Sequence, residues 1–231
     1  MSFENRIKIV GTNHISLKSQ EDIKKAFLDF KPTNICVELD SQRLYSILHP
    51  QTQKISLKLI KLLGFKGFFF MLLAKFVQQK LGRLVGVKPG SEMLFAINLA
   101  KNNNLTLNLI DKPIDKTIKR LMKKLSFKEK WFFVVDLFKG FLFKSKQPKI
   151  KINLTEVPSE DLIYSLLIQL KSRYPTVYSV LIDERNHFMA KKIVLLLKKN
   201  PENTFLIVVG AGHKKEISSL VSSYHSKIEI I

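Results

Sequence analysis

Two segments near opposite ends of the chain share one pattern, an apolar run that ends in Gly-x-x-His. Residues 7–14 read Ile-Lys-Ile-Val-Gly-Thr-Asn-His, and residues 205–213 read Phe-Leu-Ile-Val-Val-Gly-Ala-Gly-His. Each predicts a buried strand, a glycine turn and a histidine at the start of a helix, where α/β proteins place reactive groups. We therefore expect His14 and His213 to meet at the carboxyl edge of one sheet.

The remaining segments predict a single α/β domain over residues 1–231. Its simplest architecture is a mixed or parallel central sheet of about five strands with helices on both faces. Two segments rich in Leu, Phe and Lys, at 52–88 and 126–157, are expected to form a helical insertion or cap. The expected strands are 5–10, 34–39, 105–110, 204–209 and 227–231. The expected helices are 19–30, 41–48, 91–103, 114–124, 127–144, 159–172, 176–199 and 213–223.

Composition restricts the compartment and the partners. The chain carries 39 Lys and Arg against 19 Asp and Glu, and its net charge of +20 favours an anionic partner. The lysines are spread along amphipathic segments without a recognisable nucleic-acid module, so a solvated basic surface is favoured over specific nucleic-acid binding. Cys36 is the only cysteine, which excludes a thiolate zinc cluster and a disulfide framework. The sequence shows no secretory signal and no spanning helix, which predicts a cytoplasmic protein.

Three side chains at the ends of predicted strands form a candidate metal site. His14, His213 and Glu38 supply two imidazoles and a carboxylate, the ligands of an ion that activates water. This set suits Zn²⁺, Mn²⁺, Co²⁺ or iron about equally well. A single Gly-x-x-His is more often a structural turn than a ligand, and Glu38 can instead pair with Arg43.

Two other polar segments have more than one interpretation. Asp111 follows the predicted strand at 105–110 and belongs either to this site or to the cap of the next helix. Residues 183–186 read Asp-Glu-Arg-Asn and match an ordinary solvated helix face when taken alone.

Together these segments resemble the TraB/PrgY family, which is related to GumN and to the Tiki proteins. The resemblance covers nearly the whole chain and is closest to the archaeal-type members. It rests on Gly-Thr-Asn-His at 11–14, Val-Glu-Leu-Asp with Arg43 at 37–43, Pro-Gly-Ser-Glu-Met with Ala96 and Ala100 at 89–100, Ile-Asp-Lys-Pro-Ile-Asp-Lys-Thr-Ile-Lys-Arg at 110–120, Ile-Asp-Glu-Arg-Asn-His-Phe-Met-Ala at 182–190 and Val-Gly-Ala-Gly-His at 209–213.

The resemblance implies an α/β fold shared with erythromycin-esterase-like and ChaN-like proteins, with both Gly-x-x-His motifs lining one pocket. Tiki relatives are described as metal-dependent proteases, and PrgY-like members are linked to shutdown of a peptide pheromone. It implies that Glu184 acts as a general base or further ligand and that Arg185 stabilises the carbonyl oxygen. Arg43, Asp111 and Glu92 are expected to bind substrate.

These expectations lead to two alternative functions. The first is a metal-dependent hydrolase of peptides in which Glu38 holds the ion (Mn²⁺, Co²⁺ or Zn²⁺) or the water that it activates. The second is a non-enzymatic peptide-binding or membrane-surface regulator of the same fold, at an anionic membrane and peripheral to it. The Phe/Leu/Lys segments then serve as a lid, as a homodimer contact or as a lipid contact.

Two positions depart from the family pattern. Lys112 stands where the family often has arginine, and Asn186 stands where it has aspartate.

Overall fold

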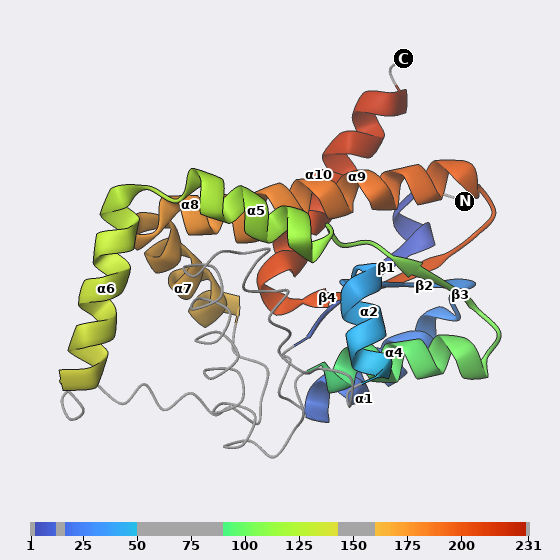
Figure 1. The fold of residues 1–231 in the computed structure, drawn as a ribbon. Coiled ribbons are helices and arrows are strands. Elements are labelled where there is room, and N and C mark those ends of the chain that lie inside the picture. Colours follow the sequence, from blue (N-terminus) through green and yellow to red (C-terminus); the bar gives the residue numbers. More distant parts are fainter. Residues whose placement is uncertain (1–2, 13–16, 50–89, 143–159, 230–231) are drawn as a thin grey trace.

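A parallel sheet forms the centre of the computed structural model, which describes residues 3–12, 17–49, 90–142 and 160–229 (Figure 1). The strands are β1 (Ile7–Thr12), β2 (Asn34–Val37), β3 (Thr106–Leu109) and β4 (Phe205–Gly210). They lie in the order β1-β4-β2-β3, and all neighbouring pairs are parallel. The two Gly-x-x-His segments therefore leave adjacent strands, with Thr12 paired to Gly210. The predicted α/β class and parallel sheet are confirmed.

Helices cover the two faces of the sheet in separate groups. Helices α1 (Leu17–Phe30) and α4 (Ser91–Asn102) bury side chains such as Ile23 and Met93 against one face. Helices α9 (Glu184–Lys199) and α10 (Ala211–Glu229) pack Ile193 and Ile217 against the other face. Figure 1 shows α9 on one side of the strands and α4 on the other.

This arrangement creates a topological switch at β4. Helix α1 follows β1, and helix α2 (Ser41–Leu48) follows β2. Both pack on the face of the sheet that α4 covers. The segment after β4 is α10, which packs on the opposite face. Neighbouring strands whose connections leave on opposite faces open a crevice at their carboxyl ends, and ligands of open α/β sheets bind there.

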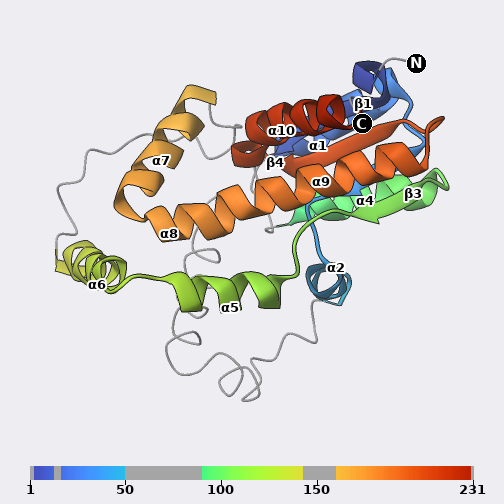
Figure 2. The same cartoon turned by 90° about the horizontal axis from the view of Figure 1, so that it is seen from above.

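The remaining helices lie beyond the carboxyl edge of the sheet (Figure 2). They are α5 (Ile114–Lys124), α6 (Phe127–Leu142), α7 (Glu160–Arg173) and α8 (Pro175–Tyr178), and the π-helical turn η3 (Ser179–Asp183) joins α8 to α9. A short 3₁₀ helix η1 (Phe3–Arg6) precedes β1. The predicted helical segment at 52–88 lies outside the described residues. Within the described ranges, no helix has the length and apolarity to cross a membrane.

The fifth strand expected at 227–231 is wrong, because α10 continues through Glu229. Its buried side chains include Ile217 and Val221, a spacing of four that places them on one helical face. Ser222 and Ser226 each bond back to the carbonyl four residues earlier, which suits a helix. A short apolar run at the chain end does not distinguish a strand from a helix by itself.

Candidate functional site

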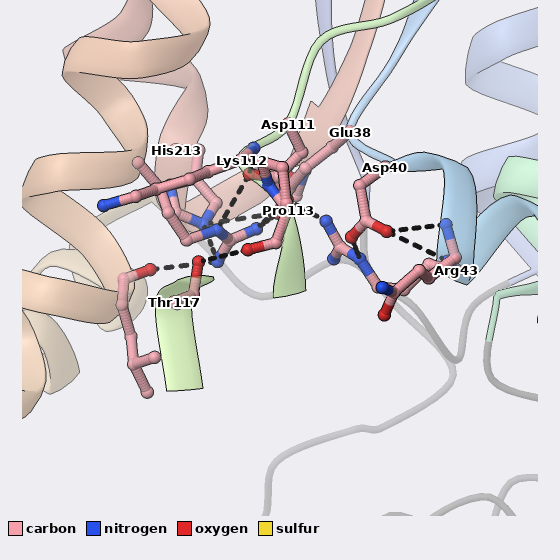
Figure 3. Close-up of polar contacts among 12 residues, drawn as sticks. Glu38, Asp40, Arg43, Asp111, Lys112, Pro113, Thr117 and His213 are labelled. Atoms are coloured by element: carbon pink, nitrogen blue, oxygen red, sulfur yellow. Dashed lines mark hydrogen bonds and ion pairs between the residues drawn. The ribbon is translucent and has the colours of Figure 1, made fainter. Parts of the chain in front are cut away.

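The carboxyl edge of the sheet brings four of the predicted residues together. Glu38 directly follows β2, Asp111 follows β3, Arg185 lies in the first turn of α9 and His213 in the first turn of α10. Glu38, Asp111 and His213 are 5%, 3% and 6% exposed, so their polar atoms must find partners inside the protein. Figure 3 shows these three side chains gathered at one point. We call these four residues the buried cluster.

Arg185 is the centre of the buried cluster. Its Nε and Nη2 donate to the two carboxylate oxygens of Asp111 at 3.0 and 2.6 Å, and Nη2 also bonds to Glu38 Oε1. Its Nη1 donates to the Leu181 carbonyl at 2.9 Å and faces His213 Nε2 at 3.3 Å. These contacts use all five N–H donors of the guanidinium. Arg185 therefore holds the ends of β2, β3 and α10 to α9.

The π-helical turn η3 prepares this position. Glu184 N–H bonds to the Ser179 carbonyl, five residues back, which widens the turn before α9. The Leu181 carbonyl, within the same turn, accepts from Arg185 Nη1. Single π-helical turns often occur at functional sites, and this one places a cation beside two buried carboxylates.

Burial and charge compete in setting the pKa of both carboxylates. Burial alone would raise the pKa of Glu38, but His213, Arg185 and the hydrogen bond from Gly210 N–H, at 2.6 Å, lower it below its usual value. Burial likewise raises the pKa of Asp111, and the hydrogen bonds and charges of Arg185 and Arg43 outweigh it. Both groups are therefore anionic at neutral pH.

His213 is fixed in one tautomer by its neighbour on α9. Its Nδ1 lies 2.5 Å from Asn186 Oδ1, and Asn186 is 1% exposed. Because a carbonyl oxygen only accepts, Nδ1 carries a proton, and whenever the ring is neutral its lone pair is at Nε2. That nitrogen faces Glu38 Oε1 at 3.4 Å and Arg185 Nη1 at 3.3 Å.

Arg43 approaches the buried cluster from α2 (Figure 3). The helix begins after Asp40, whose carboxylate accepts from the N–H groups of Gln42 and Arg43 at 2.8 and 3.1 Å. Arg43 donates Nε to Asp40 at 2.8 Å and Nη2 to Asp111, rather than pairing with Glu38. Its side chain is 30% exposed, and its Nη1 bonds to none of the described residues. Through Arg43 the buried cluster is thus connected to a partly exposed side chain.

Glu184 lies in a separate group of charges next to the buried cluster. Lys112 Nζ, Arg120 Nε and Lys124 Nζ donate to its carboxylate at 2.9, 3.1 and 2.8 Å. Burial opposes ionisation, but the hydrogen bonds from the three cations lower the pKa of Glu184 to about 2. A carboxylate of such low pKa is a weak general base at neutral pH.

The two remaining predicted residues are His14 and Glu92. His14 lies outside the described residues. Glu92 is buried in the first turn of α4, which packs on the other face of the sheet from α9 and α10. Sequence reasoning missed the partnership of Asn186 with His213, and it missed the cations Arg120 and Lys124. Arg120 and Lys124 lie four residues apart on a basic helix, and this spacing was the signal in the sequence that could have identified them.

The described donors do not fit a divalent ion as they are arranged. The 3.4 Å between His213 Nε2 and Glu38 Oε1 suits two ligands of one ion at about 2 Å each. Arg185 bonds to that same oxygen and faces that same nitrogen, so its guanidinium stands where a shared ion would bind. In the described ranges, no group of three or more His, Cys, Asp or Glu side chains is placed to hold a metal. The third predicted ligand, His14, is outside those ranges.

Fold and site together define a parallel α/β protein with a buried carboxylate, arginine and histidine cluster at the switch point of its sheet. This class includes many unrelated activities, so similarity to known proteins must narrow it. The chain belongs to the TraB/PrgY/gumN family, whose model matches residues 2–226. The family expected from the sequence is therefore confirmed.

Three relatives match this chain over about nine tenths of its length. An uncharacterised protein of Methanocaldococcus jannaschii is 37% identical over an aligned length of 215 residues, and the alignment covers 91% of this chain and 52% of that protein. The TraB domain-containing protein of Homo sapiens is 28% identical over an aligned length of 234 residues, and the alignment covers 90% of this chain and 61% of that protein. The protein of the same name from Mus musculus is 27% identical, with the same coverage. The chain thus spans between 52% and 61% of the length of these relatives.

Proposed function

We propose that this chain is a hydrolase that cleaves peptide bonds at the buried cluster. The observation that carries the proposal is His213, whose Nδ1 is fixed by Asn186 and whose Nε2 lone pair lies between Glu38 and Arg185. An imidazole with its proton fixed on one nitrogen is ready to accept a second proton on the other. Its place at the switch point of a parallel sheet is where α/β proteins bind ligands.

In this proposal His213 takes a proton from the attacking water through Nε2. The imidazolium that forms lies 3.4 Å from the Glu38 carboxylate, which stabilises the new charge. Once Nε2 is protonated, it no longer accepts from Arg185 Nη1, at 3.3 Å. That N–H donor then becomes available to the negative charge that develops on the substrate carbonyl oxygen. Protonation of the base and release of the oxyanion donor are thus one event, and the imidazolium then returns its proton to the leaving amine nitrogen as the C–N bond breaks.

Arg43 is the proposed anchor for a substrate carboxylate. Its side chain reaches the solvent while Asp40 and Asp111 hold two of its three nitrogens. The remaining Nη1 suits a carboxylate of the peptide, because guanidinium donors match carboxylate geometry.

Peptide cleavage tests the proposal directly. The purified chain is incubated with a defined peptide mixture, and products are identified by mass spectrometry for the wild type, His213→Gln and His187→Gln. His187 is the matched control, because it also lies on the α9 and α10 face but is 45% exposed and bonds to Tyr224. We expect His213→Gln to lose about 100-fold or more in rate and His187→Gln to match the wild type. The proposal is overturned if the wild type cleaves no peptide, or if His213→Gln cleaves peptides at the wild-type rate.

The same assay decides the metal dependence predicted from the sequence. Activity that survives a chelator supports proton transfer by His213 without an ion. If a chelator removes the activity and Mn²⁺, Co²⁺ or Zn²⁺ restores it, the result supports His14, His213 and Glu38 as ligands of a metal ion. It also refutes the role of His213 as a general base.

A second candidate function is attachment to an anionic membrane surface through α6. Phe127 and Trp131 are 89% and 67% exposed and lie one helical turn apart on α6. Lys130 Nζ lies 4.8 Å from the centre of the Phe127 ring. Exposed aromatic rings beside lysines favour the interface of an anionic bilayer.

Polar contacts hold this helix in place. Asp136 of α6 accepts from Arg173 Nε at 3.0 Å and from the Tyr174 hydroxyl at 2.6 Å. Glu129 is 3% exposed and accepts from the Thr176 N–H at 2.7 Å. The exposed rings are therefore presented by an anchored helix and not by a free end.

Co-sedimentation with vesicles tests this alternative. We expect the wild type to bind phosphatidylglycerol vesicles more strongly than phosphatidylcholine vesicles, and the double variant Phe127→Ser/Trp131→Ser to bind at least about tenfold more weakly. Tyr164→Ser, at a ring that is 60% exposed on α7, is the control and should bind as the wild type does. Equal binding by both variants argues against this surface. If the wild type is a dimer and the double variant is a monomer, the two rings belong to the contact of the predicted homodimer instead.

A further inference from the structure

We infer that Lys112, Arg120 and Lys124 form a binding site for a phosphate-type oxyanion beside the buried cluster, organised by Glu184. The three cations come from two parts of the chain. Lys112 follows β3, whereas Arg120 and Lys124 lie one turn apart on α5. All three reach the same carboxylate at the start of α9, at 2.9, 3.1 and 2.8 Å.

The charges in this group do not balance. Three cations surround one carboxylate, which leaves a local excess of two positive charges. The count holds at neutral pH because the pKa of Glu184 is about 2. One cation would suffice to pair Glu184, and each further one adds repulsion between like charges. An oxyanion that carries two negative charges, such as phosphate, compensates this excess.

The cations also keep donors for such a ligand. Lys112 and Lys124 each use one N–H on Glu184, and an ammonium group has three. Arg120 donates only through Nε, and its two terminal nitrogens bond to none of the described residues. The side chains of Lys112, Arg120 and Lys124 are 20%, 49% and 38% exposed, so a ligand from solvent can reach them. Charge-assisted bonds from several such donors are the usual means of holding phosphate oxygens.

The site adjoins the cluster along the chain at two points. Lys112 follows Asp111, and its own N–H donates to the Asp111 carboxylate at 2.6 Å. Glu184 precedes Arg185, which binds that same carboxylate. A bound phosphate would therefore lie beside the buried cluster, and its binding does not require the proposed hydrolysis.

Binding of inorganic phosphate at low ionic strength tests the inference, followed by isothermal titration calorimetry and by ³¹P line broadening. We expect saturable binding by the wild type, and Arg120→Gln and Lys124→Gln to weaken it about tenfold each. Lys119→Gln and Lys123→Gln remove the same charge from exposed positions of the same helix and should change affinity less than about twofold. Glu184→Gln raises the local excess from two charges to three and should tighten binding.

Two results of the phosphate titrations would overturn the inference. One is no saturable binding by a wild-type protein whose circular dichroism shows it folded. The other is an equal loss in the Lys119→Gln control, which would show only the general attraction of a basic surface. Parallel titrations with phenyl phosphate and with glutarate distinguish the sources. Binding of both phosphates but not of the dicarboxylate assigns a phosphate group, free or esterified, and preference for glutarate refutes the phosphate assignment.

Discussion

Replacement of Arg185 by leucine tests the central role given to this side chain. The substitution leaves Glu38 and Asp111 buried without the cation that binds both of them. Removal of one partner from a buried ion pair costs about 3–5 kcal/mol, because the other charge stays desolvated and uncompensated. Against a typical free energy of unfolding of about 5–15 kcal/mol, such a loss is readily measured.

Urea denaturation at pH 7 and pH 4 measures this effect and its origin. In the wild type, the pKa values of Glu38 and Asp111 lie below their ordinary values of 4.5 and 3.8. The two carboxylates therefore contribute to the free energy of unfolding in full when the pH is above the ordinary pKa values, and this contribution is lost as the pH falls through the lowered pKa values. Arg185→Leu removes one of the causes that lower both pKa values, so both rise above their wild-type values. The variant then loses less stability than the wild type as the carboxylates become protonated, and the gap in stability between the two proteins should narrow at pH 4.

Arg173→Leu is the matched control for this experiment. Arg173 also donates two hydrogen bonds to one carboxylate, that of Asp136, but the two side chains are 41% and 38% exposed. An exposed pair of this kind contributes little to stability, because solvent screens it. The reasoning fails if Arg185→Leu costs no more than Arg173→Leu, or if its cost is the same at both pH values.

Three further outcomes follow from the structure. A Cβ on Gly11 would lie 3.0 Å from a side-chain atom of Lys214 in α10, so Gly11→Ala should lower the free energy of unfolding by about 1–3 kcal/mol. A Cβ on Gly212 would lie inside a helix with its nearest neighbours at 3.9 Å, so Gly212→Ala should raise the free energy of unfolding by up to about 1 kcal/mol. Thermal denaturation measures both changes. Cys36 is fully buried and its pKa is raised to about 12, first by burial, so Ellman's reagent at pH 8 should label it only after unfolding; rapid labelling of the folded chain would contradict the structure. Glu184→Gln should lose up to about 1 kcal/mol in urea titrations near neutral pH. This difference should disappear as pH falls from 4.5 toward about 2, and a constant difference would refute the ion pairing.

Much of the fold follows from local patterns that the sequence carries openly. The apolar runs at 34–37 and 205–209 indicate central strands, because a parallel sheet buries both faces of such strands, and the run at 7–10 forms the edge strand β1. Asp40 directly precedes the expected helix at 41–48, aspartate is a preferred capping residue, and the structure shows that Asp40 caps α2. These features depend on residues close together along the chain, so periodicity and capping chemistry reveal them. The end of α10 shows the limit, since a few apolar residues suit either kind of element.

The sequence by itself determined the class, the four strands of the sheet and the residue types at the carboxyl edge, including Glu38, Asp111 and His213, although it also suggested a fifth strand that is absent from the described residues. Only the tertiary structure decided which partners those side chains have. Arg185 joins elements separated by more than a hundred residues, Asn186 sets the tautomer of His213, and Glu184 belongs to the cations of α5. No local pattern encodes such pairings, because a side chain's charge state and hydrogen bonds depend on what packing brings within about 3 Å of it in space.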